Sequence, residues 1–154
     1  MKNIIVACDF SSEDEAIETI EQLKDEIFGI KVGLQYVTST GTEGVKSLLK
    51  FNLPIMYDIK ALDIRNTVVE FTKTLKNLKV SYATVHLLNG EKTLKEAVKH
   101  ADNVKLIGIS VLTSFSDETL QKLGFLNNVE KQVERLVKIA SAAELYGVVC
   151  SPRE

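Results

Sequence analysis

The stretch MYDIKALDIRNT, residues 56–67, joins the end of an apolar run to a cluster of charged side chains. Two aspartates and a lysine, Asp58, Lys60 and Asp63, lie within six positions of one another. Burying a charged group costs free energy unless the group is paired and hydrogen-bonded. The carboxyl ends of the parallel strands in a barrel instead open onto a wet rim, where enzymes place their polar side chains. The stretch therefore predicts a strand that ends at a functional rim.

A short apolar run followed by a helical pattern recurs along the chain. Strands are predicted over residues 3–9, 29–33, 53–60, 82–88, 104–113 and 146–151. Helices are predicted over residues 11–27, 42–51, 66–78, 91–100 and 127–145. The first helix carries a capping box at Ser12 and Glu15. Almost uniformly apolar strands that alternate with helices predict a parallel sheet covered by helices.

Two α/β architectures fit this pattern, a doubly wound open sheet and a (β/α)₈ barrel. The first strand is not followed by G-x-G-x-x-G, which argues against a dinucleotide-binding sheet. Polar residues lie at or near the carboxyl ends of predicted strands, namely Asp9, Lys31, Lys60 and Thr113. Barrel enzymes assemble their sites from that rim. We therefore expect a TIM-type (β/α) barrel, incomplete with about six of the eight βα units, as a single partial domain over residues 1–154.

The composition is that of an ordinary globular protein, with 45% hydrophobic and 26% charged residues in a chain of 154. The net charge is -2 and no basic block is present, so neither nucleic acid nor a membrane is an expected partner. The amino terminus lacks the long apolar core of a signal peptide, and we expect a cytoplasmic protein. Cys8 and Cys150 lie in apolar runs and are predicted to be buried, reduced thiols. No His, Cys or Asp spacing suggests zinc.

The spacing of the charged residues suggests how they would act together. Residues two apart in a strand point to the same side, so Asp58 and Lys60 are expected to project together into the barrel mouth. Lys31 on the neighbouring strand can join them, and Asp63 follows on the loop. The result would be an Asp–Lys–Asp–Lys array of zero net charge, in which nearby acids keep the lysines charged. The alternative from spacing alone is a solvated charge pattern on an exposed strand.

Such an array could remove CO₂ from a substrate without a cofactor. A substrate carboxylate pressed near Asp58 is repelled by the like charge, and loss of CO₂ relieves the repulsion. Lys60 could then stabilise and protonate the carbanion that remains, which is electrostatic preorganisation combined with acid catalysis.

The run DIKALDIRNT resembles the D-x-K-x-x-D-I-x-N-T signature of orotidine 5'-phosphate decarboxylases. VACDF, KVG, TVH, VLTS and GVVCSPRE resemble, in the same order, strands one, two, four, five and six of that family. The shorter D-x-K-x-x-D also occurs in related sugar-phosphate decarboxylases, an alternative that DIRNT and VLTS disfavour. Arg65 departs from the family, which usually has proline there, and Ala61 and Leu62 replace a bulkier pair.

The resemblance implies a cofactor-independent carboxy-lyase that converts orotidine 5'-monophosphate to UMP and CO₂, the last step of de novo pyrimidine biosynthesis. By position, Lys60 would donate the proton to C6 of the pyrimidine, and Asp58 would lie near the substrate carboxylate. Lys31 would bind on the ribose side, Asp9 would contact the ribose, and Thr113 would touch the pyrimidine ring. Neither a metal nor an organic cofactor is implied.

The resemblance also implies an assembly. Asp63, Ile64 and Thr67 would reach into the active site of a partner subunit, which implies a homodimer with shared active sites. A full barrel needs about 250 residues, and the family's last two strands, with their phosphate-binding segment, have no counterpart among the residues of this sequence. The first and sixth strands are then expected to be open edges, and weaker phosphate binding would reduce catalysis. The alternative function is an inactive remnant or assembly module that retains the amino-terminal part of the barrel.

Overall fold

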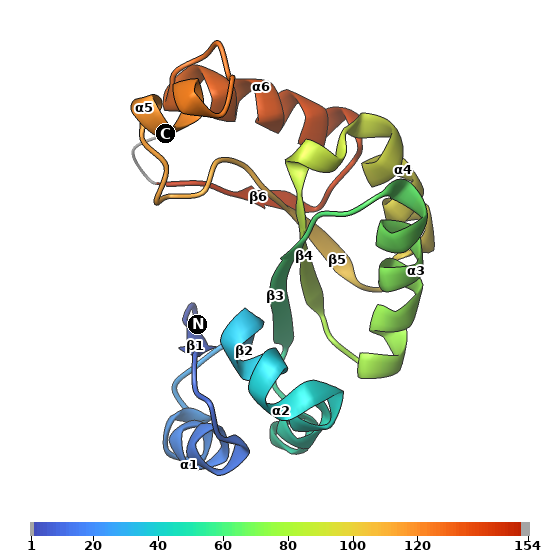
Figure 1. Cartoon of the computed structure of the whole chain (residues 1–154). Coiled ribbons are helices and arrows are strands. Elements are labelled where there is room, and N and C mark those ends of the chain that lie inside the picture. The colour runs from blue at the N-terminus through green and yellow to red at the C-terminus, as the bar shows by residue number, and fades with distance from the viewer. Residues whose placement is uncertain (1, 152–154) are drawn as a thin grey trace.

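The structure is a computed structural model in which residues 2–151 are described. Its parallel sheet has the order β1-β2-β3-β4-β5-β6. The strands are β1 (Ile5–Cys8), β2 (Gly29–Gly33), β3 (Ile55–Ala61), β4 (Tyr82–His86), β5 (Lys105–Ile109) and β6 (Gly147–Val149). They follow an arc that is open between β1 and β6 (Figure 1). The predicted α/β fold, an incomplete barrel, is confirmed.

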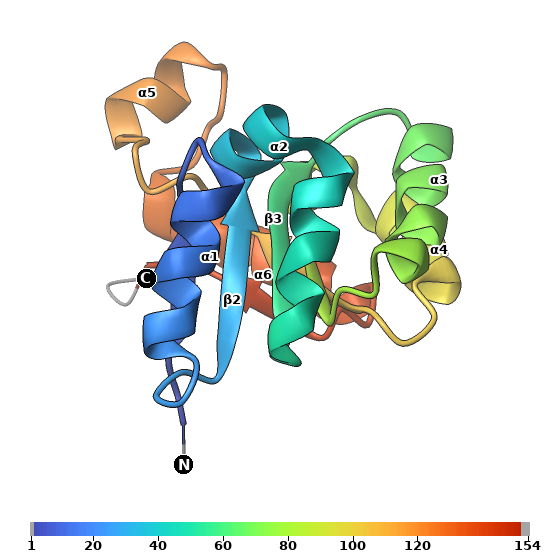
Figure 2. The same ribbon diagram turned by 90° about the horizontal axis from the view of Figure 1, so that it is seen from below.

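Helices cover the outer side of the arc (Figures 1 and 2). They are α1 (Glu13–Leu23), α2 (Leu34–Ser47), α3 (Arg65–Leu75), α4 (Glu91–His100), α5 (Asp117–Lys122) and α6 (Val129–Ala142), with short 3-10 turns η1 (Leu48–Phe51), η2 (Lys76–Leu78) and η3 (Leu87–Asn89). The predicted cap of the first helix is present, because Ser12 Oγ accepts a hydrogen bond from the Glu15 backbone N–H. No helix within residues 2–151 has the length and apolar character needed to span a membrane.

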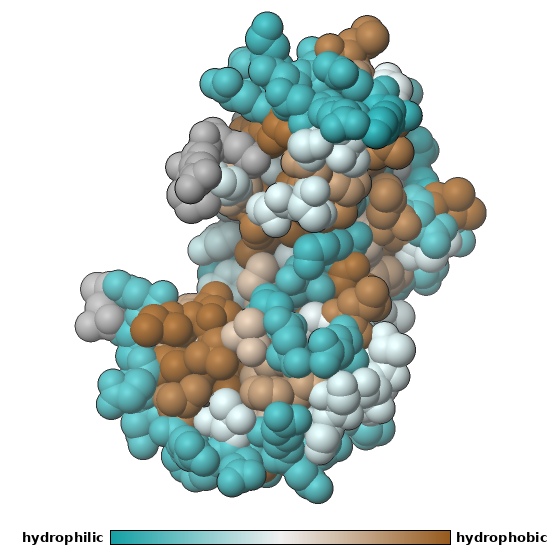
Figure 3. Space-filling model, turned by 60° about the vertical axis from the view of Figure 1, so that its left-hand side comes forward, coloured by the Kyte–Doolittle hydropathy of each residue, from teal (hydrophilic) through white to brown (hydrophobic). Residues whose placement is uncertain are grey.

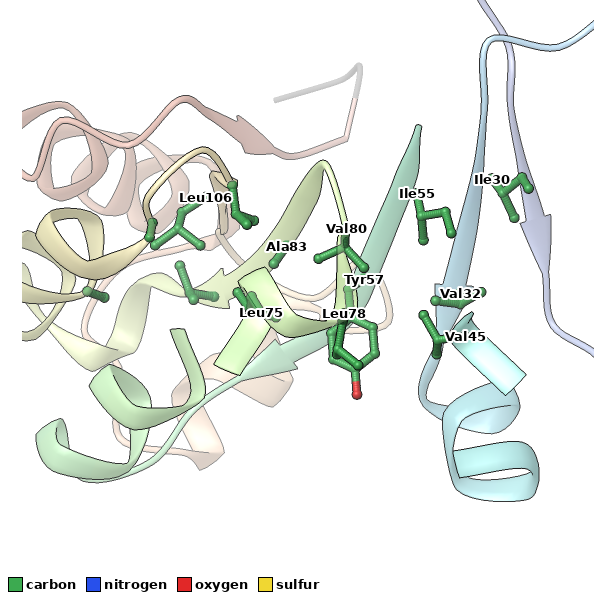
Figure 4. Packing of buried hydrophobic residues seen from close by; sticks show 14 of the residues in the cluster. Ile30, Val32, Val45, Ile55, Tyr57, Leu75, Leu78, Val80, Ala83 and Leu106 are labelled. Carbon is green, nitrogen blue, oxygen red and sulfur yellow. The ribbon is translucent and has the colours of Figure 1, made fainter. Parts of the chain in front are cut away.

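The core lies between the sheet and this outer layer of helices. Ile30 and Val32 of β2 pair in register with Ile55 and Tyr57 of β3, and all four are buried. Figure 4 shows these side chains together with Val45 of α2, which packs from the helix layer. Each fully buried side chain of this kind contributes roughly 1.5–3 kcal/mol relative to exposure.

This outward packing determines where the charged side chains go. Successive side chains of a strand point to opposite faces, and Tyr57 packs outward against Phe71 of α3 with ring centroids 6.2 Å apart. Lys31 lies between the outward Ile30 and Val32, so it points to the concave side of the sheet. Asp58 follows the outward-facing Tyr57 in β3, so it points to the concave side of the sheet, as Lys31 does. The same alternation along a strand therefore places every second side chain in the core and the side chains between them on the concave side, where the charged residues lie.

Several predicted boundaries are wrong, among them the start of the second helix and the end of the fifth strand. The second helix begins at Leu34 rather than at residue 42, and Gly41 interrupts it with φ 66° and ψ -167°. In this part of the helix the Thr38 and Thr40 hydroxyl groups donate hydrogen bonds to the carbonyl oxygens of Leu34 and Tyr36, four residues earlier. The fifth strand ends at Ile109, because its pairing with the short β6 ends there.

The predicted burial of the two cysteines is half right. Cys8, at the end of β1, is fully buried, whereas Cys150 is exposed, and both thiols are free. Cys150 follows β6, an edge strand whose outer side has no pairing strand in the described part of the chain. A cysteine in an apolar run is buried only when a neighbour covers that run.

Apolar side chains reach the surface on the open side of the arc. Figure 3 shows hydrophobic surface gathered on this side. Ile5 of β1 is 40% exposed and Val149 of β6 is 43% exposed, although both belong to strands. Unpaired strand edges of this kind can pair with a further strand.

Candidate active site

Four charged side chains of alternating sign lie at the carboxyl ends of β1, β2 and β3. Lys31 Nζ lies 3.2 Å from Asp9 Oδ1 and 3.8 Å from Asp58 Oδ2. Lys60 Nζ lies 2.9 Å from the same Asp58 oxygen. The order in space is therefore Asp9–Lys31–Asp58–Lys60, which we call the charged array, and its formal charges sum to zero.

Exposure differs along the charged array. Asp58 is only 9% exposed, with a lysine on each side. The Lys60 side chain is 43% exposed, so its ammonium group is both paired and accessible from solvent. A paired, accessible ammonium can stabilise developing negative charge and deliver a proton, since it is held before the reaction begins.

Asp63, predicted as a member of this array, lies outside it. Its Oδ1 accepts a hydrogen bond of 2.6 Å from the Ile64 backbone N–H. Among residues 2–151 it forms no ion pair with a lysine or arginine. Asp9 takes the fourth place instead, because it directly follows β1 and β1 pairs in register with β2, which carries Lys31. Lys31, Asp58 and Lys60 lie together as predicted.

The backbone that carries Lys60 is irregular. Lys60 has φ 53°, in the left-handed region, which costs a non-glycine residue roughly 1–2 kcal/mol. The register of β3 against β4 shifts here, from the pair Tyr57–Ala83 to the pair Ala61–Val85. Only Thr84 of β4 lies between those pairs, opposite three residues of β3. We call residues 58–60 the β3 bulge.

Thr84 makes two contacts with the β3 bulge that sequence reasoning did not identify. Its Oγ1 accepts a hydrogen bond of 2.9 Å from the Lys60 backbone N–H and donates one of 2.8 Å to Asp58 Oδ1. The available signal was its strand position, two residues before His86 and on the same face.

A second residue not identified from the sequence, Asn89, holds the loop that follows β3. Its Nδ2 donates hydrogen bonds of 2.8 Å to the carbonyls of Ala61 and His86, and its Oδ1 accepts one of 3.2 Å from the Asp63 backbone N–H. The end of β3 and the end of β4 are therefore joined by one amide side chain.

An apolar cavity of about 360 Å³ lies at the same rim. It is lined by Leu62, His86, Leu88, Ser110, Val111, Leu112, Phe115, Leu120, Leu123, Phe125, Gln132 and Leu136. Burial lowers the pKa of His86 below its usual 6.5. His86 Nδ1 accepts a hydrogen bond of 3.2 Å from the Leu88 N–H, which leaves the ring proton of the neutral form on Nε2. A cavity with this lining suits an apolar part of a small-molecule ligand.

The remaining predicted site residues are exposed and apart from the charged array. Ile64, 73% exposed, precedes α3, and Thr67 lies in the first turn of that helix. Thr113 lies in the loop between β5 and α5, since the strand ends before it. Ile64 and Asp63 line an open groove of about 610 Å³ between α3 and α4. Within the described residues, no group of three or more His, Cys, Asp or Glu side chains is placed to hold a metal ion.

Comparison with known proteins gives a consistent result. A curated protein from Wolbachia pipientis subsp. Culex pipiens (strain wPip), named orotidine 5'-phosphate decarboxylase, is 40% identical over 100% of this chain and 69% of its own length. One of the same name from Dictyoglomus turgidum is 38% identical over 98% of this chain and 66% of its own length. The chain thus spans about two thirds of the length of these relatives.

Solved structures agree with the curated relatives. The crystal structure of orotidine 5'-phosphate decarboxylase from Lactobacillus acidophilus matches with a TM-score of 0.91 at 30% identity, over 100% of this chain and 73% of that one. Orotidine 5'-monophosphate decarboxylase from Methanocaldococcus jannaschii, complexed with inhibitor BMP, matches with a TM-score of 0.81 at 27% identity, over 97% of this chain and 67% of that one. The family model described as orotidine 5'-phosphate decarboxylase / HUMPS family matches residues 2–154. With this fold and this charged array, the chain belongs to the orotidine 5'-phosphate decarboxylase / HUMPS family.

Proposed function

We propose that the chain catalyses the decarboxylation of orotidine 5'-monophosphate to UMP and CO₂ without a metal or an organic cofactor. The observation that carries the proposal is the position of Lys60 Nζ, 2.9 Å from a buried Asp58 carboxylate and still accessible to solvent. The substrate is inferred from the names of the relatives, which are orotidine 5'-phosphate decarboxylases. A cytoplasmic location belongs to the same proposal.

In the proposed reaction the bond between C6 and the carboxyl carbon breaks, and its electron pair stays on C6. Asp58 lies beside the substrate carboxylate, and the repulsion between the two anions is relieved as neutral CO₂ leaves. Lys60 stabilises the C6 carbanion by its positive charge and transfers a proton to it, and then regains a proton from water. Lys31, 3.8 Å from Asp58 Oδ2, keeps that carboxylate paired when Lys60 turns to the substrate.

The rest of the substrate is assigned to neighbouring groups of the rim. Asp9 and Lys31, joined at 3.2 Å, are proposed to bind the ribose hydroxyl groups. Thr113 is proposed to contact the pyrimidine ring, near the apolar cavity that Leu112 helps to line. Asp63, Ile64 and Thr67 are proposed to complete the site of a partner subunit in a homodimer, because all three are exposed beside the start of α3.

A second candidate function is that of an assembly module without catalysis. It is favoured by the open sheet edges, where Ile5 and Val149 are 40% and 43% exposed. In this case the chain would act through strand pairing with another polypeptide, and the charged array would be a retained family feature.

The two candidates are separated by one assay. Purified chain is added to orotidine 5'-monophosphate and the loss of substrate absorbance is recorded, with Lys60→Ala as the test variant. Lys46→Ala is the matched control, because Lys46 of α2 is also 44% exposed and paired, with Glu43 at 2.6 Å, and lines neither the apolar cavity nor the groove between α3 and α4. Decarboxylation that is lost in Lys60→Ala and retained in Lys46→Ala supports the enzyme. A wild-type rate equal to that of Lys60→Ala rejects catalysis by the chain and leaves the assembly module.

A further inference from the structure

Thr84 is a buried hydroxyl group between the backbone and the side chains of the β3 bulge. It lies in the middle of β4 and has no exposed surface. Its Oγ1 lies 2.9 Å from the Lys60 backbone nitrogen and 2.8 Å from Asp58 Oδ1. One atom of β4 therefore contacts both residues to which the proposed function gives the central roles.

The directions of these two hydrogen bonds follow from the chemistry of the groups. A backbone N–H can only donate, so Thr84 Oγ1 must accept from Lys60. A carboxylate can only accept, so the single hydroxyl proton of Thr84 points at Asp58. The hydroxyl group is thus used once as acceptor and once as donor, and no side chain without both capacities can replace it.

The accepted bond replaces a missing bond of the sheet. Because the register shifts between the pairs Tyr57–Ala83 and Ala61–Val85, the β3 bulge falls outside the regular ladder. A backbone N–H needs a partner when it is away from water. The Thr84 hydroxyl supplies that partner for Lys60 and holds the residue in its left-handed conformation, φ 53°.

Because Thr84 donates to one oxygen of the Asp58 carboxylate, the two carboxylate oxygens have different partners. Oδ1 is bound by Thr84, and Oδ2 faces Lys60 at 2.9 Å and Lys31 at 3.8 Å. With one oxygen held by a buried hydroxyl group, the carboxylate cannot turn without breaking a bond. The geometry of the Lys60–Asp58 pair therefore depends on Thr84 through the backbone of one residue and the side chain of the other.

We propose that Thr84 is a positioning residue that holds the Lys60–Asp58 pair in its reactive arrangement. The inference rests on the proposed decarboxylation for its catalytic consequence, but the hydrogen-bonding role can be measured independently of activity. A small displacement of a reacting group can reduce a rate by about 100-fold, which gives the scale of the expected effect.

The test variants are Thr84→Val, which keeps the shape and removes the hydroxyl group, and Thr84→Ser, which keeps the hydroxyl group. Thr72→Val is the matched control. Thr72 is also buried, at 1% exposed, but its hydroxyl donates a hydrogen bond of 2.7 Å to the Val68 carbonyl within α3, its one side-chain bond among residues 2–151. Circular dichroism checks that each variant folds.

The first readout is amide hydrogen exchange at Lys60, measured by NMR. We expect the Lys60 amide to exchange at least about 10-fold faster in Thr84→Val than in the wild type, and at the wild-type rate in Thr84→Ser and Thr72→Val. An unchanged Lys60 rate in Thr84→Val overturns the inference. If Thr84→Val does not fold, the exchange rate of the Lys60 amide in the wild-type chain decides instead. A rate as fast as in an unstructured peptide would show that this amide has no hydrogen-bond partner, and it would overturn the inference.

The second readout is the division of the effect between kcat and KM for orotidine 5'-monophosphate. We expect kcat to fall by roughly 10-fold to 100-fold in Thr84→Val with KM changed by less than about threefold, and to recover in Thr84→Ser. A kcat in Thr84→Val equal to that of Thr72→Val overturns the positioning role. If the wild-type chain itself is inactive, the proposed function fails, and the exchange measurement alone decides on Thr84.

Discussion

Lys60 Nζ lies 2.9 Å from Asp58 Oδ2, and the two side chains differ widely in exposure. The Asp58 side chain is 12% exposed, whereas the Lys60 side chain is 43% exposed. A pair that served stability alone would gain little from this arrangement, because water screens the exposed partner. The arrangement suits a cation that must meet a substrate while it is held by a buried anion.

Lys60→Ala should therefore separate activity from stability. We expect the rate of decarboxylation to fall by about 100-fold to 10,000-fold, which is the usual contribution of a positioned acid. We expect the free energy of unfolding to change by less than about 1 kcal/mol, because Lys31 still faces Asp58 and the lost pair is partly exposed. Urea denaturation and the absorbance assay measure the two effects. A loss of more than about 3 kcal/mol would instead identify a buried structural ion pair.

Gly29→Ala should destabilise the chain through a steric clash in the sheet. A Cβ added at Gly29, the first residue of β2, would lie 2.6 Å from the Pro54 carbonyl oxygen, which belongs to the backbone and cannot turn aside. We expect a loss of about 1–3 kcal/mol in the free energy of unfolding, measured by urea denaturation. Gly147→Ala at the start of β6 is the control, since no contact atom of the described residues lies within 4 Å of its added Cβ. Equal effects in the two variants would contradict this explanation.

Ile64→Asp tests the proposed homodimer. Ile64 is 73% exposed and lines the groove between α3 and α4. If the partner subunit covers this groove, a buried charge there should shift the chain to a monomer, because an unpaired charge in an interface is costly. Sedimentation equilibrium measures the mass. Leu126→Asp is the control, since Leu126 is fully exposed outside this groove. A wild-type chain that sediments as a monomer would refute the homodimer directly.

Periodicity in the sequence was enough to place most elements of the fold. The predicted bounds of β2 and of α4 match the structure, because strongly patterned segments reveal their own ends. The end of β5 could not be predicted in this way. Its apolar run continues to Leu112, but a strand ends where its pairing with the neighbouring strand ends, and β6 is short.

The convergence of the main charged residues of the candidate site could be predicted from the sequence, but the backbone that carries them could not. Lys31, Asp58 and Lys60 converge because the strand period places them on one face at one edge. The left-handed backbone of Lys60 was not predictable, since lysine carries no signal for that conformation and the register shift depends on pairing with β4. Thr84 was not identified for the same reason, because its role arises only from that shift.

His86 should make stability depend on pH. Burial lowers its pKa in the folded chain, so the unfolded chain, with a pKa near 6.5, takes up a proton first as the pH falls. The contribution of His86 to the free energy of unfolding is therefore fully present above about pH 6.5, and it decreases as the pH falls from there to the pKa of the folded chain. Among residues 2–151, no acidic or basic side chain other than His86 lines the cavity, and protonation of Nδ1 would remove the hydrogen bond from the Leu88 N–H.

Urea midpoints between pH 5 and pH 8 measure this dependence. His86→Gln should flatten the decrease below pH 6.5, whereas His100→Gln, at the exposed end of α4, should leave it as in the wild type. A decrease of the same size in His86→Gln would assign the pH dependence to other groups.

The two cysteines should differ sharply in reactivity toward a thiol reagent. Burial raises the pKa of Cys8 to about 11. The negative charge of Asp9 adds a smaller increase, and the positive charge of Lys31 lowers the pKa in part. At pH 8 roughly one Cys8 thiol in a thousand is then ionised, and the thiolate is the reactive form. Cys150 is exposed. We expect one thiol to react rapidly in the folded chain and two in urea, and Cys150→Ser to leave the folded chain almost unlabelled. Rapid labelling of folded Cys150→Ser would show that β1 opens readily, since Cys8 is the last residue of that strand and belongs to the buried core.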